Sequence, residues 1–161
     1  MNTPSSGAHT PIIRGGQLHD AARIADVIRS AKADAMPWLA VPHSAAEDEQ
    51  WIVDILLPQH TVRLACDHRD PTRIIAVLAT SPGWLDQLYV APGEQNRGVG
   101  SQLVRIAQHE ARGPLTLWTF QRNSRARSFY TKHGFVEVRR TPGDNEESEP
   151  DILYQWQPVS M

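Results

Sequence analysis

Residues 95–100 of this chain read Gln95-Asn96-Arg97-Gly98-Val99-Gly100, and the segment around them, residues 85–138, decides the fold. Before the glycines, Leu85-Asp86-Gln87-Leu88-Tyr89-Val90 has the composition of a strand. After them, small and apolar side chains recur at the spacing of one helical face, at Val99, Leu103, Ile106 and Ala107. The first turn of such a helix has unpaired N–H groups and the positive end of the helix dipole, which together favour an anion such as phosphate. The segment therefore predicts a strand, a glycine loop suited to phosphate, and a helix.

The rest of the C-terminal half continues this alternation. Residues 115–120 have strand composition, and Asn123 is a predicted N-cap for a helix over residues 124–133. Two more strands are expected at residues 135–138 and 151–156, with an acidic loop between them.

The N-terminal half predicts a strand at residues 12–14 and an amphipathic helix over residues 21–31. Residues 61–66 and 74–80 are two strands joined by a turn, so they are expected to form an antiparallel hairpin. The apolar segment 36–42 contains two prolines, which favours a loop. That loop would either cover the core or form one wall of an acceptor pocket.

A second helix in this half is expected to begin at Ser44 and stop at Pro58. Ser44 and Glu47 have the spacing of a capping box, in which each side chain bonds the other residue's N–H group. The expected inner face of the helix carries Trp51, Ile52, Ile55 and Leu56.

The composition is that of an ordinary globular protein: 161 residues, 40% hydrophobic and 21% charged, with a formal net charge of −2. This length predicts a single domain over residues 11–157 that follows a flexible tail at residues 1–10. The charge gives no reason to expect nucleic acid as a partner, and no apolar run is long enough to span a membrane. The single cysteine, Cys66, excludes an internal disulfide and favours the cytoplasm, as does the lack of an apolar secretory leader.

Two motifs resemble those of the GCN5-related N-acetyltransferases, the GNAT family. Residues 95–100 match Gln/Arg-x-x-Gly-x-Gly/Ala at the start of a helix, and Asn123 is followed by Phe129-Tyr130 and Gly134-Phe135. Both motifs are complete and in the family's order. The resemblance implies an α/β (α+β) GNAT fold, in which a mixed, mostly antiparallel sheet of about six or seven strands has helices on both faces.

The same resemblance implies an N-acetyltransferase with acetyl-coenzyme A as donor, an amine as acceptor and no metal. The backbone near Gly98 would hold the pyrophosphate, and pantetheine would pair with the strand that ends at Val90 where it splays from the strand at 115–120. Tyr130 would be the general acid for the leaving thiolate. Family members often pair, so a homodimer is one expected assembly. The expected cofactor-binding residues are Leu88, Tyr89, Val90, Gln95, Asn96, Arg97, Gly98, Val99, Gly100, Ser101, Asn123, Ala126 and Phe129.

Each of these residues also has a structural interpretation. Gly98 and Gly100 would suit a tight turn, Asn123 would be a helix cap alone, and Tyr130 would be a buried tyrosine with a bonded hydroxyl. A separate alternative keeps the phosphate-binding loop but has no general acid: the domain would then bind acyl-coenzyme A as a sensor or interaction module without catalysis. A nucleotide-binding domain is disfavoured, because neither Gly-x-x-x-x-Gly-Lys-Ser/Thr nor Gly-x-Gly-x-x-Gly occurs.

The candidate general base is Asp86, which precedes Leu88 by two residues and shares its strand face. Glu94, acting through water, is another candidate base. The alternative interpretation of Asp86 is a structural carboxylate. Residues 144–151 hold five acids and no base, which predicts either a site for a cationic acceptor (a polyamine, an amino sugar or a lysine side chain) or a solvated loop. The candidate acceptor-binding residues, for most of which core packing is the alternative, are Trp38, Trp84, Trp118, Phe120 and Glu147.

Overall fold

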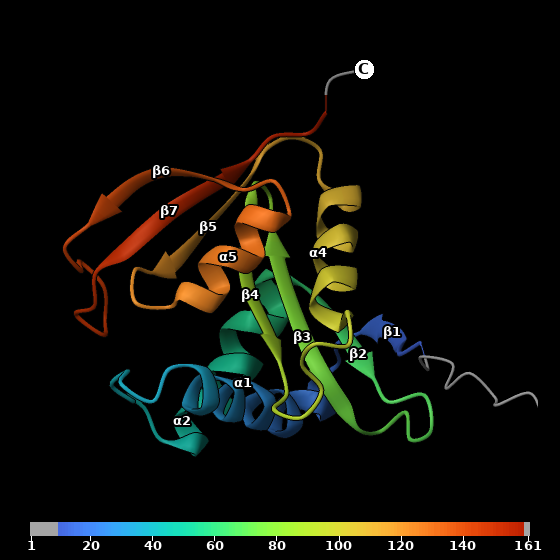
Figure 1. The fold of residues 1–161 in the computed structure, drawn as a ribbon. Helices are drawn as coiled ribbons and strands as arrows, with labels where there is room; N and C mark the ends of the chain where they lie inside the picture. Colours follow the sequence, from blue (N-terminus) through green and yellow to red (C-terminus); the bar gives the residue numbers. More distant parts are fainter. Residues whose placement is uncertain (1–9, 160–161) are drawn as a thin grey trace, which may run out of the picture.

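The computed structural model describes residues 10–159, which form a seven-stranded sheet with helices on both faces (Figure 1). The strand order is β1-β2-β3-β4-β5-β7-β6, and all neighbours are antiparallel except β4 and β5. The strands are β1 (Ile12–Gly15), β2 (Thr61–Cys66), β3 (Ile74–Ser81), β4 (Trp84–Val90), β5 (Leu115–Phe120), β6 (Val136–Thr141) and β7 (Asp151–Trp156). The predicted mixed, mostly antiparallel sheet is confirmed. The predicted tail at residues 1–10 lies, apart from Thr10, outside the described residues.

The helices follow the predicted order. They are η1 (Leu18–Asp20), α1 (Ala21–Ala35), α2 (Ala45–Trp51), the π-helical turn η2 (Ile52–Leu56), α3 (Leu57–Gln59), α4 (Val99–Glu110) and α5 (Ser124–Lys132). Figure 1 shows α1 and α2 on one side of the central strands and α4 and α5 on the other.

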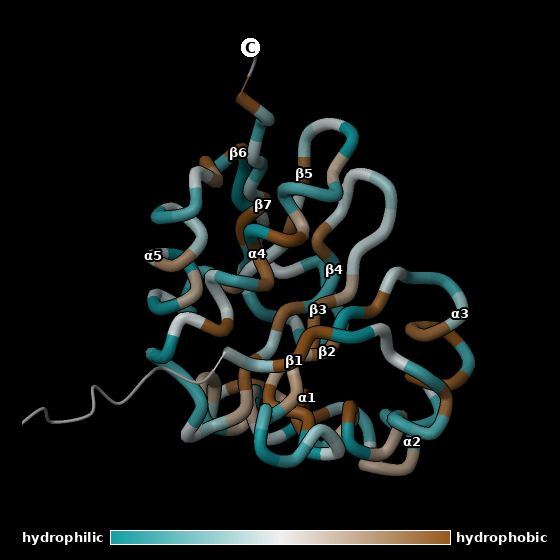
Figure 2. The backbone as a smooth tube through the Cα atoms, turned by 90° about the vertical axis from the view of Figure 1, so that its right-hand side faces the viewer, coloured by the Kyte–Doolittle hydropathy of each residue, from teal (hydrophilic) through white to brown (hydrophobic). Residues whose placement is uncertain are grey.

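Each face of the sheet has its own hydrophobic core. Leu64 and Cys66 of β2 belong to the core with α1 and η2, whereas Ala65 between them belongs to the core with α4 and α5. This is the period-two alternation of a strand that is covered on both faces. The strands β1 to β3 are accordingly among the hydrophobic stretches in Figure 2. The two cores fix the strands that carry the site described below.

The helical segment after Ser44 departs from the prediction at one residue. The capping box forms, with the Glu47 amide donating to Ser44 Oγ at 3.1 Å and the Ser44 amide donating to Glu47 Oε1 at 3.0 Å. Ile52 and Leu56 are buried as expected, but Trp51 is 40% exposed, so its predicted place on the inner face is wrong. The reason is local: the wide π turn begins directly after Trp51 and ends the α-helical repeat on which the prediction relied.

The strands β4 and β5 meet at only one residue pair, Trp84 with Thr116, and then diverge. Figure 1 shows β5, β7 and β6 turning away from β4 beyond this point. β4 also contains a bulge: Thr80 of β3 faces Leu85 and Ala79 faces Gln87, which leaves Asp86 without a cross-strand partner. A bulge bends a strand and redirects its side chains, and here it lies where the sheet opens.

Candidate active site

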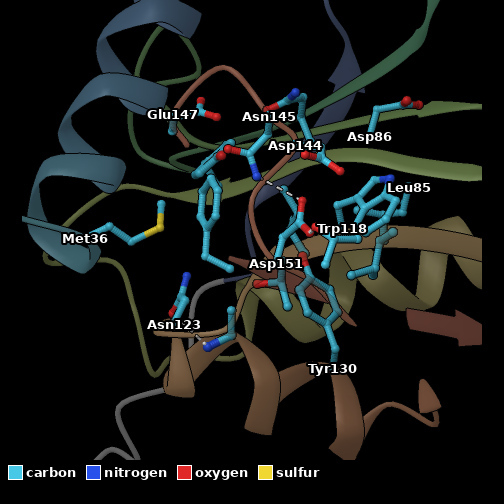
Figure 3. Close-up of a pocket in the computed structure, with 18 of the residues that line it drawn as sticks. Met36, Leu85, Asp86, Trp118, Asn123, Tyr130, Asp144, Asn145, Glu147 and Asp151 are labelled. Carbon is cyan, nitrogen blue, oxygen red and sulfur yellow. Dashed lines mark hydrogen bonds between the residues drawn. The ribbon is translucent and has the colours of Figure 1, made fainter. Parts of the chain in front are cut away.

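A cleft of about 530 Å³ opens where β4 and β5 diverge (Figure 3). Its walls come from four parts of the chain that are distant in sequence: β4, β5, the first two turns of α5, and the loop between β6 and β7. Met36, which follows α1, closes one end. The polar residues of the lining include Asp86, Gln87, Asn123, Tyr130, Glu147 and Asp151.

The start of α4 has the backbone of an anion site. Gly98 is the N-cap and adopts a left-handed conformation with φ +83°, which favours glycine. Gly100 lies so close to α5 that an added Cβ would be 3.3 Å from Phe129 Cζ and 3.6 Å from Val90 Cγ2. The missing side chain thus lets the first turn of α4 pack against both β4 and α5, and its N–H groups remain free of a capping side chain.

The other predicted residues of this loop hold it in place. The Gln95 side chain donates to the Val90 carbonyl at 3.4 Å, and Arg125 of α5 donates to Asn96 Oδ1 at 3.4 Å. Ser101 Oγ lies 2.9 Å from Nε2 of His133, whose pKa is lowered by burial and by nearby Arg105. These contacts join the loop to β4 and α5. Arg97 is exposed and lies 3.5 Å from Glu94.

Asn123 serves as the predicted N-cap of α5, because its Oδ1 accepts from the Ala126 amide at 3.1 Å. Asn123 and Ala126 also line the cleft. The cap uses the side-chain oxygen, which leaves the Nδ2 group as a donor for a ligand. The two interpretations of Asn123, a cap and a ligand-binding residue, are therefore compatible.

Tyr130 lies at the edge of the core and on the cleft side of α5 (Figure 3). Its ring meets the rings of Phe129 and Phe135 edgewise, with centroids 5.2 Å and 5.5 Å away. Burial raises the pKa of the phenol well above its usual value, and the nearby Tyr89 adds to this effect. Within residues 10–159 its hydroxyl has no hydrogen-bond partner. Tyr130 therefore keeps its proton at neutral pH and can donate it into the cleft.

Asp86, the bulged residue of β4, lines the same cleft. Ser81 Oγ donates to its Oδ2 at 2.7 Å, and Nε2 of His60 lies 3.7 Å from its Oδ1. His60 Nδ1 lies 3.1 Å from the Leu56 carbonyl, which can only accept, so Nδ1 donates this hydrogen bond. Glu94, the other candidate base, pairs with Arg73 at 2.9 Å and is not among the cleft residues.

The predicted acceptor residues divide into three groups. Trp118, Phe120 and Glu147 line the cleft. Trp38 is not in the lining but packs edgewise on Phe120, with centroids 6.0 Å apart. Trp84 is 38% exposed at the start of β4, before the strands diverge, and lies outside the lining.

Asp151 and Gln87 also line the cleft; Asp151 belongs to the predicted acidic segment 144–151, but neither residue was predicted individually. Asp151 is 8% exposed; it accepts from the Thr141 hydroxyl and, at 3.0 Å, from the Asn145 side chain (Figure 3). It thereby fixes the β6–β7 loop beside the cleft. Its position at the start of a strand, next to an acidic loop, was the available sequence signal. Gln87 has no such sequence signal, because the direction of its side chain depends on the bulge in β4.

Two classes of site find no support in the part of the chain that the structure describes. Within residues 10–159, no group of His, Cys, Asp and Glu side chains is arranged to hold a metal ion. In the same range, no helix combines the length and the apolar character that a membrane crossing needs.

Comparison with known proteins agrees with the geometry. The family model described as an acetyltransferase (GNAT) domain matches residues 46–137, more than half of the chain. The chain belongs to the GNAT family. The matched residues run from α2 to β6 and include the glycine loop, Asp86 and Tyr130, so the cleft is largely built from the part that defines the family.

One curated GNAT relative and two solved structures show the range of similarity. A stretch of 77 residues, 47% of this chain, is 34% identical to Probable N-acetyltransferase Rv2775 of Mycobacterium tuberculosis, and the chain covers 37% of that protein's length. The apo form of YjaB from Escherichia coli has a TM-score of 0.74 at 22% identity, with 92% of this chain and 98% of that chain covered. YncA from Salmonella typhimurium, solved with its cofactor acetyl-CoA, has a TM-score of 0.70 at 15% identity, with 94% and 95% covered. These two similarities show that the chain shares the overall fold of both proteins.

Proposed function

We propose that this GNAT-family chain transfers the acetyl group of acetyl-coenzyme A to a primary amine on a small molecule or a protein. The observation that carries the proposal is the cleft between the diverging strands, to which α5 contributes Asn123 and Tyr130 and β4 contributes Asp86 (Figure 3). A proton donor and a proton acceptor thus border one space.

The donor would be held by groups whose environment suits it. The first turn of α4 offers free N–H groups for the pyrophosphate, and Asn123 offers its amide. Beyond Trp84 the edge of β4 has no strand partner on the β5 side, so backbone groups of Leu88 to Val90 are available to an extended chain such as pantetheine. When bound, acetyl-coenzyme A supplies an activated thioester.

The residues of the cleft would then do three things. Asp86 accepts a proton from the substrate ammonium, directly or through water, so that a neutral amine is present. Backbone N–H groups near Leu88 to Val90 stabilise negative charge on the carbonyl oxygen. The amine nitrogen bonds to the acetyl carbon and loses its second proton to solvent, the carbon–sulfur bond breaks, and Tyr130 donates its proton to the sulfur. The products are an N-acetyl amine and a thiol, and solvent returns the proton to Tyr130.

A direct assay tests the proposal. Release of free thiol from acetyl-coenzyme A is measured with a panel of primary amines, and binding of coenzyme A is measured separately by calorimetry. Amine-dependent thiol release is the expected result. Binding of coenzyme A without amine-dependent release would instead support a non-catalytic acyl-coenzyme A sensor.

Replacing Gly100 with valine is expected to weaken coenzyme A binding by about 10-fold or more. A branched side chain at this position overpacks the contact with Phe129, whose Cζ would be 3.3 Å from the new Cβ, and displaces the first turn of α4; such overpacking typically costs about 1–3 kcal/mol. Calorimetric titration with coenzyme A measures the effect. The matched control is Gly113→Val, because an added Cβ there meets nothing within 4 Å. Equal affinities in the two variants would contradict the placement of the cofactor at this turn.

Replacing Glu147 with glutamine is expected to raise KM for a cationic amine several-fold. Glu147 lines the cleft on the acidic β6–β7 loop, and its charge attracts an ammonium group through a field that salt screens over about 8–10 Å. The variant should therefore also show a smaller rise of KM with added salt. Glu49 of α2 is exposed and lines neither this cleft nor the second hollow between α1 and α2, so Glu49→Gln is the control. An unchanged salt dependence would favour the interpretation of a solvated loop.

The cytoplasm is the setting we infer for this reaction. Cys66 is a free thiol, fully buried in β2, and burial raises its pKa, so that it resists reaction. A chain with one buried thiol is suited to a reducing compartment.

A further inference from the structure

A second hollow of about 950 Å³, called the apolar groove below, adjoins the reaction cleft. It lies between α1, the loop over residues 36–43 and α2, and Met36, Gln87 and Glu147 line both spaces. Its volume is within the range of sites for small molecules. Because the cleft and the groove share these three side chains, one ligand of moderate size can contact both.

The chemistry of the apolar groove differs from that of the cleft. Its wall is formed mainly by hydrophobic side chains, namely Ile28, Leu39, Val41, Trp51 and Ile52. The segment 36–42, for which the sequence allowed either a core cover or a pocket wall, contributes most of one side. Trp51 is turned out of the core at the π turn and thereby becomes part of this wall.

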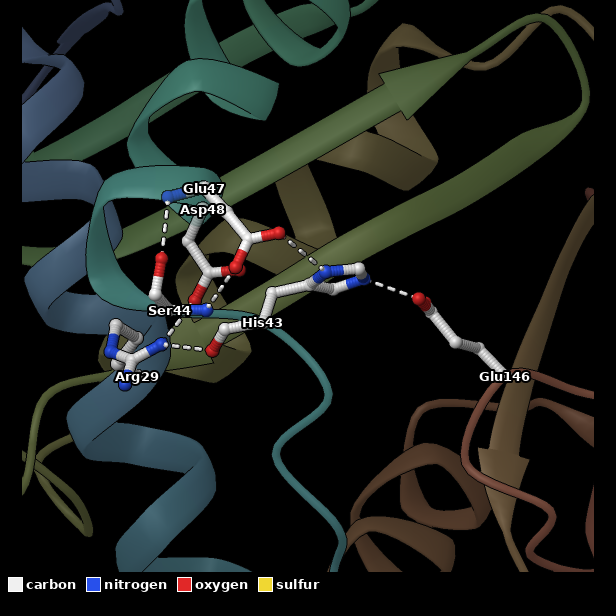
Figure 4. A network of polar contacts seen from close by, with 6 residues as sticks. All are labelled: Arg29, His43, Ser44, Glu47, Asp48 and Glu146. Carbon is white, nitrogen blue, oxygen red and sulfur yellow. Dashed lines mark hydrogen bonds and ion pairs between the residues drawn. The ribbon is translucent and has the colours of Figure 1, made fainter.

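Most charged groups of the groove are already paired with one another (Figure 4). Arg29 donates to Asp48 at 2.6 Å and to the His43 carbonyl at 3.1 Å. His43 contacts Glu146 through Nε2 and lies 3.6 Å from Glu47 through Nδ1, which joins the loop after α1 to the β6–β7 loop. Because these charges are paired with one another, the apolar wall is the surface that a ligand would contact and bury on entering the groove.

Two charged side chains of the groove remain outside these pairs, Lys32 and the shared Glu147. Lys32 lies with its ammonium 5.6 Å from the centroid of the Tyr89 ring, a side chain that also lines the cleft. Among the described residues, the acids that line the cleft, Asp86, Asp144, Glu147 and Asp151, outnumber its cation, Arg139, whereas most charges of the groove are paired with one another. A ligand that spans both spaces is therefore matched if its positive end lies in the cleft and its other end is uncharged and apolar.

We propose that the acceptor is a small primary monoamine that carries an uncharged aryl or branched alkyl group, and that this group occupies the apolar groove. The inference rests on the proposed acetyl transfer, and it narrows the acceptor class: polyamines and amino sugars would place charge or hydroxyl groups against an apolar wall. The amine would lie at the boundary formed by Gln87 and Glu147, beside Asp86.

A substrate panel combined with a groove-filling variant tests this inference. The wild-type kcat/KM for 2-phenylethylamine is expected to exceed that for propylamine and for putrescine by about 10-fold or more, the scale set by burying an apolar group in a fitting site. Ala33 is exposed on α1 and lines the groove, so Ala33→Phe should remove most of this preference. Ala35→Phe, at an exposed position of the same helix outside the lining, is the matched control.

Equilibrium binding separates failure of this inference from failure of the proposed function. Calorimetry measures 2-phenylethylamine binding to the wild type and to Ala33→Phe in the presence of coenzyme A. Binding that Ala33→Phe weakens, without turnover, would support the inference and overturn acetyl transfer. Turnover of several amines with no apolar preference, or with a preference that Ala33→Phe leaves intact, would overturn the inference alone. If neither binding nor turnover is observed, both the inference and the proposed acetyl transfer are overturned.

Discussion

Replacing Tyr130 with phenylalanine is expected to lower kcat by about 100-fold or more and to change KM for acetyl-coenzyme A little. General acids contribute about 10²- to 10⁴-fold, and the substitution removes only the hydroxyl while it keeps the edgewise ring contacts with Phe129 and Phe135. Because burial raises the pKa of this phenol above its usual value, the protonated form persists to higher pH. In the wild type, loss of the acid should therefore not limit kcat below about pH 10, the usual value for tyrosine. Thiol release measured against pH in both proteins checks these expectations.

A second tyrosine provides the control for this experiment. Tyr154 is 3% exposed, and its hydroxyl accepts from Arg127 Nε at 3.2 Å, but it does not line the cleft. Tyr154→Phe should change thermal stability modestly and leave kcat near the wild-type value. If Tyr130→Phe behaved in the same way, Tyr130 would be a core residue and the proton for the thiolate would come from elsewhere.

The local geometry of the glycine loop and of Asn123 could be predicted because its signals are local. Gly98 and Gly100 are needed where a helix starts, and Asn123 caps a helix through the amide three residues later, so each role depends on a few neighbouring residues. The succession of strands and helices along the chain followed from local patterns of the same kind. The divergence of β4 and β5 was expected only from the family resemblance, since no residue in either strand predicts it.

The acceptor half depends on contacts that a sequence pattern does not encode. His43 and Glu146 are 103 positions apart and meet only because the sheet brings two loops together. Likewise, strand alternation predicted that Asp86 shares the strand face of Leu88, but Asp86 is the bulged residue and does not follow this alternation. The Gln87 side chain next to it lines both the cleft and the apolar groove. Trp51 shows the same limit, because its helical spacing is regular up to the residue at which the π turn begins.

Replacing Asp86 with asparagine is expected to lower kcat/KM for the amine by about 100-fold or more, since the substitution removes the group proposed to accept the ammonium proton. Asparagine retains an oxygen that can accept from Ser81, so the bulge and the fold should be kept. Affinity for coenzyme A, measured by calorimetry, is expected to stay the same. The acidic limb of the kcat/KM profile, which reports protonation of the base, should be altered in the variant.

The loss of a negative charge has to be distinguished from the loss of a base, and the cleft offers the control. Asp144 also lines it, on the β6–β7 loop, so Asp144→Asn removes the same charge from the same space. If Asp86 acts as the base, Asp144→Asn raises KM modestly and preserves the acidic limb, whereas Asp86→Asn alters it. The His60 ring lies beside Asp86, with Nε2 3.7 Å from Asp86 Oδ1, so it contacts the carboxylate without lining the cleft. His60→Gln should therefore lower kcat/KM by less than Asp86→Asn does. Equal pH profiles in all three variants would mean that the amine loses its proton before it reaches Asp86.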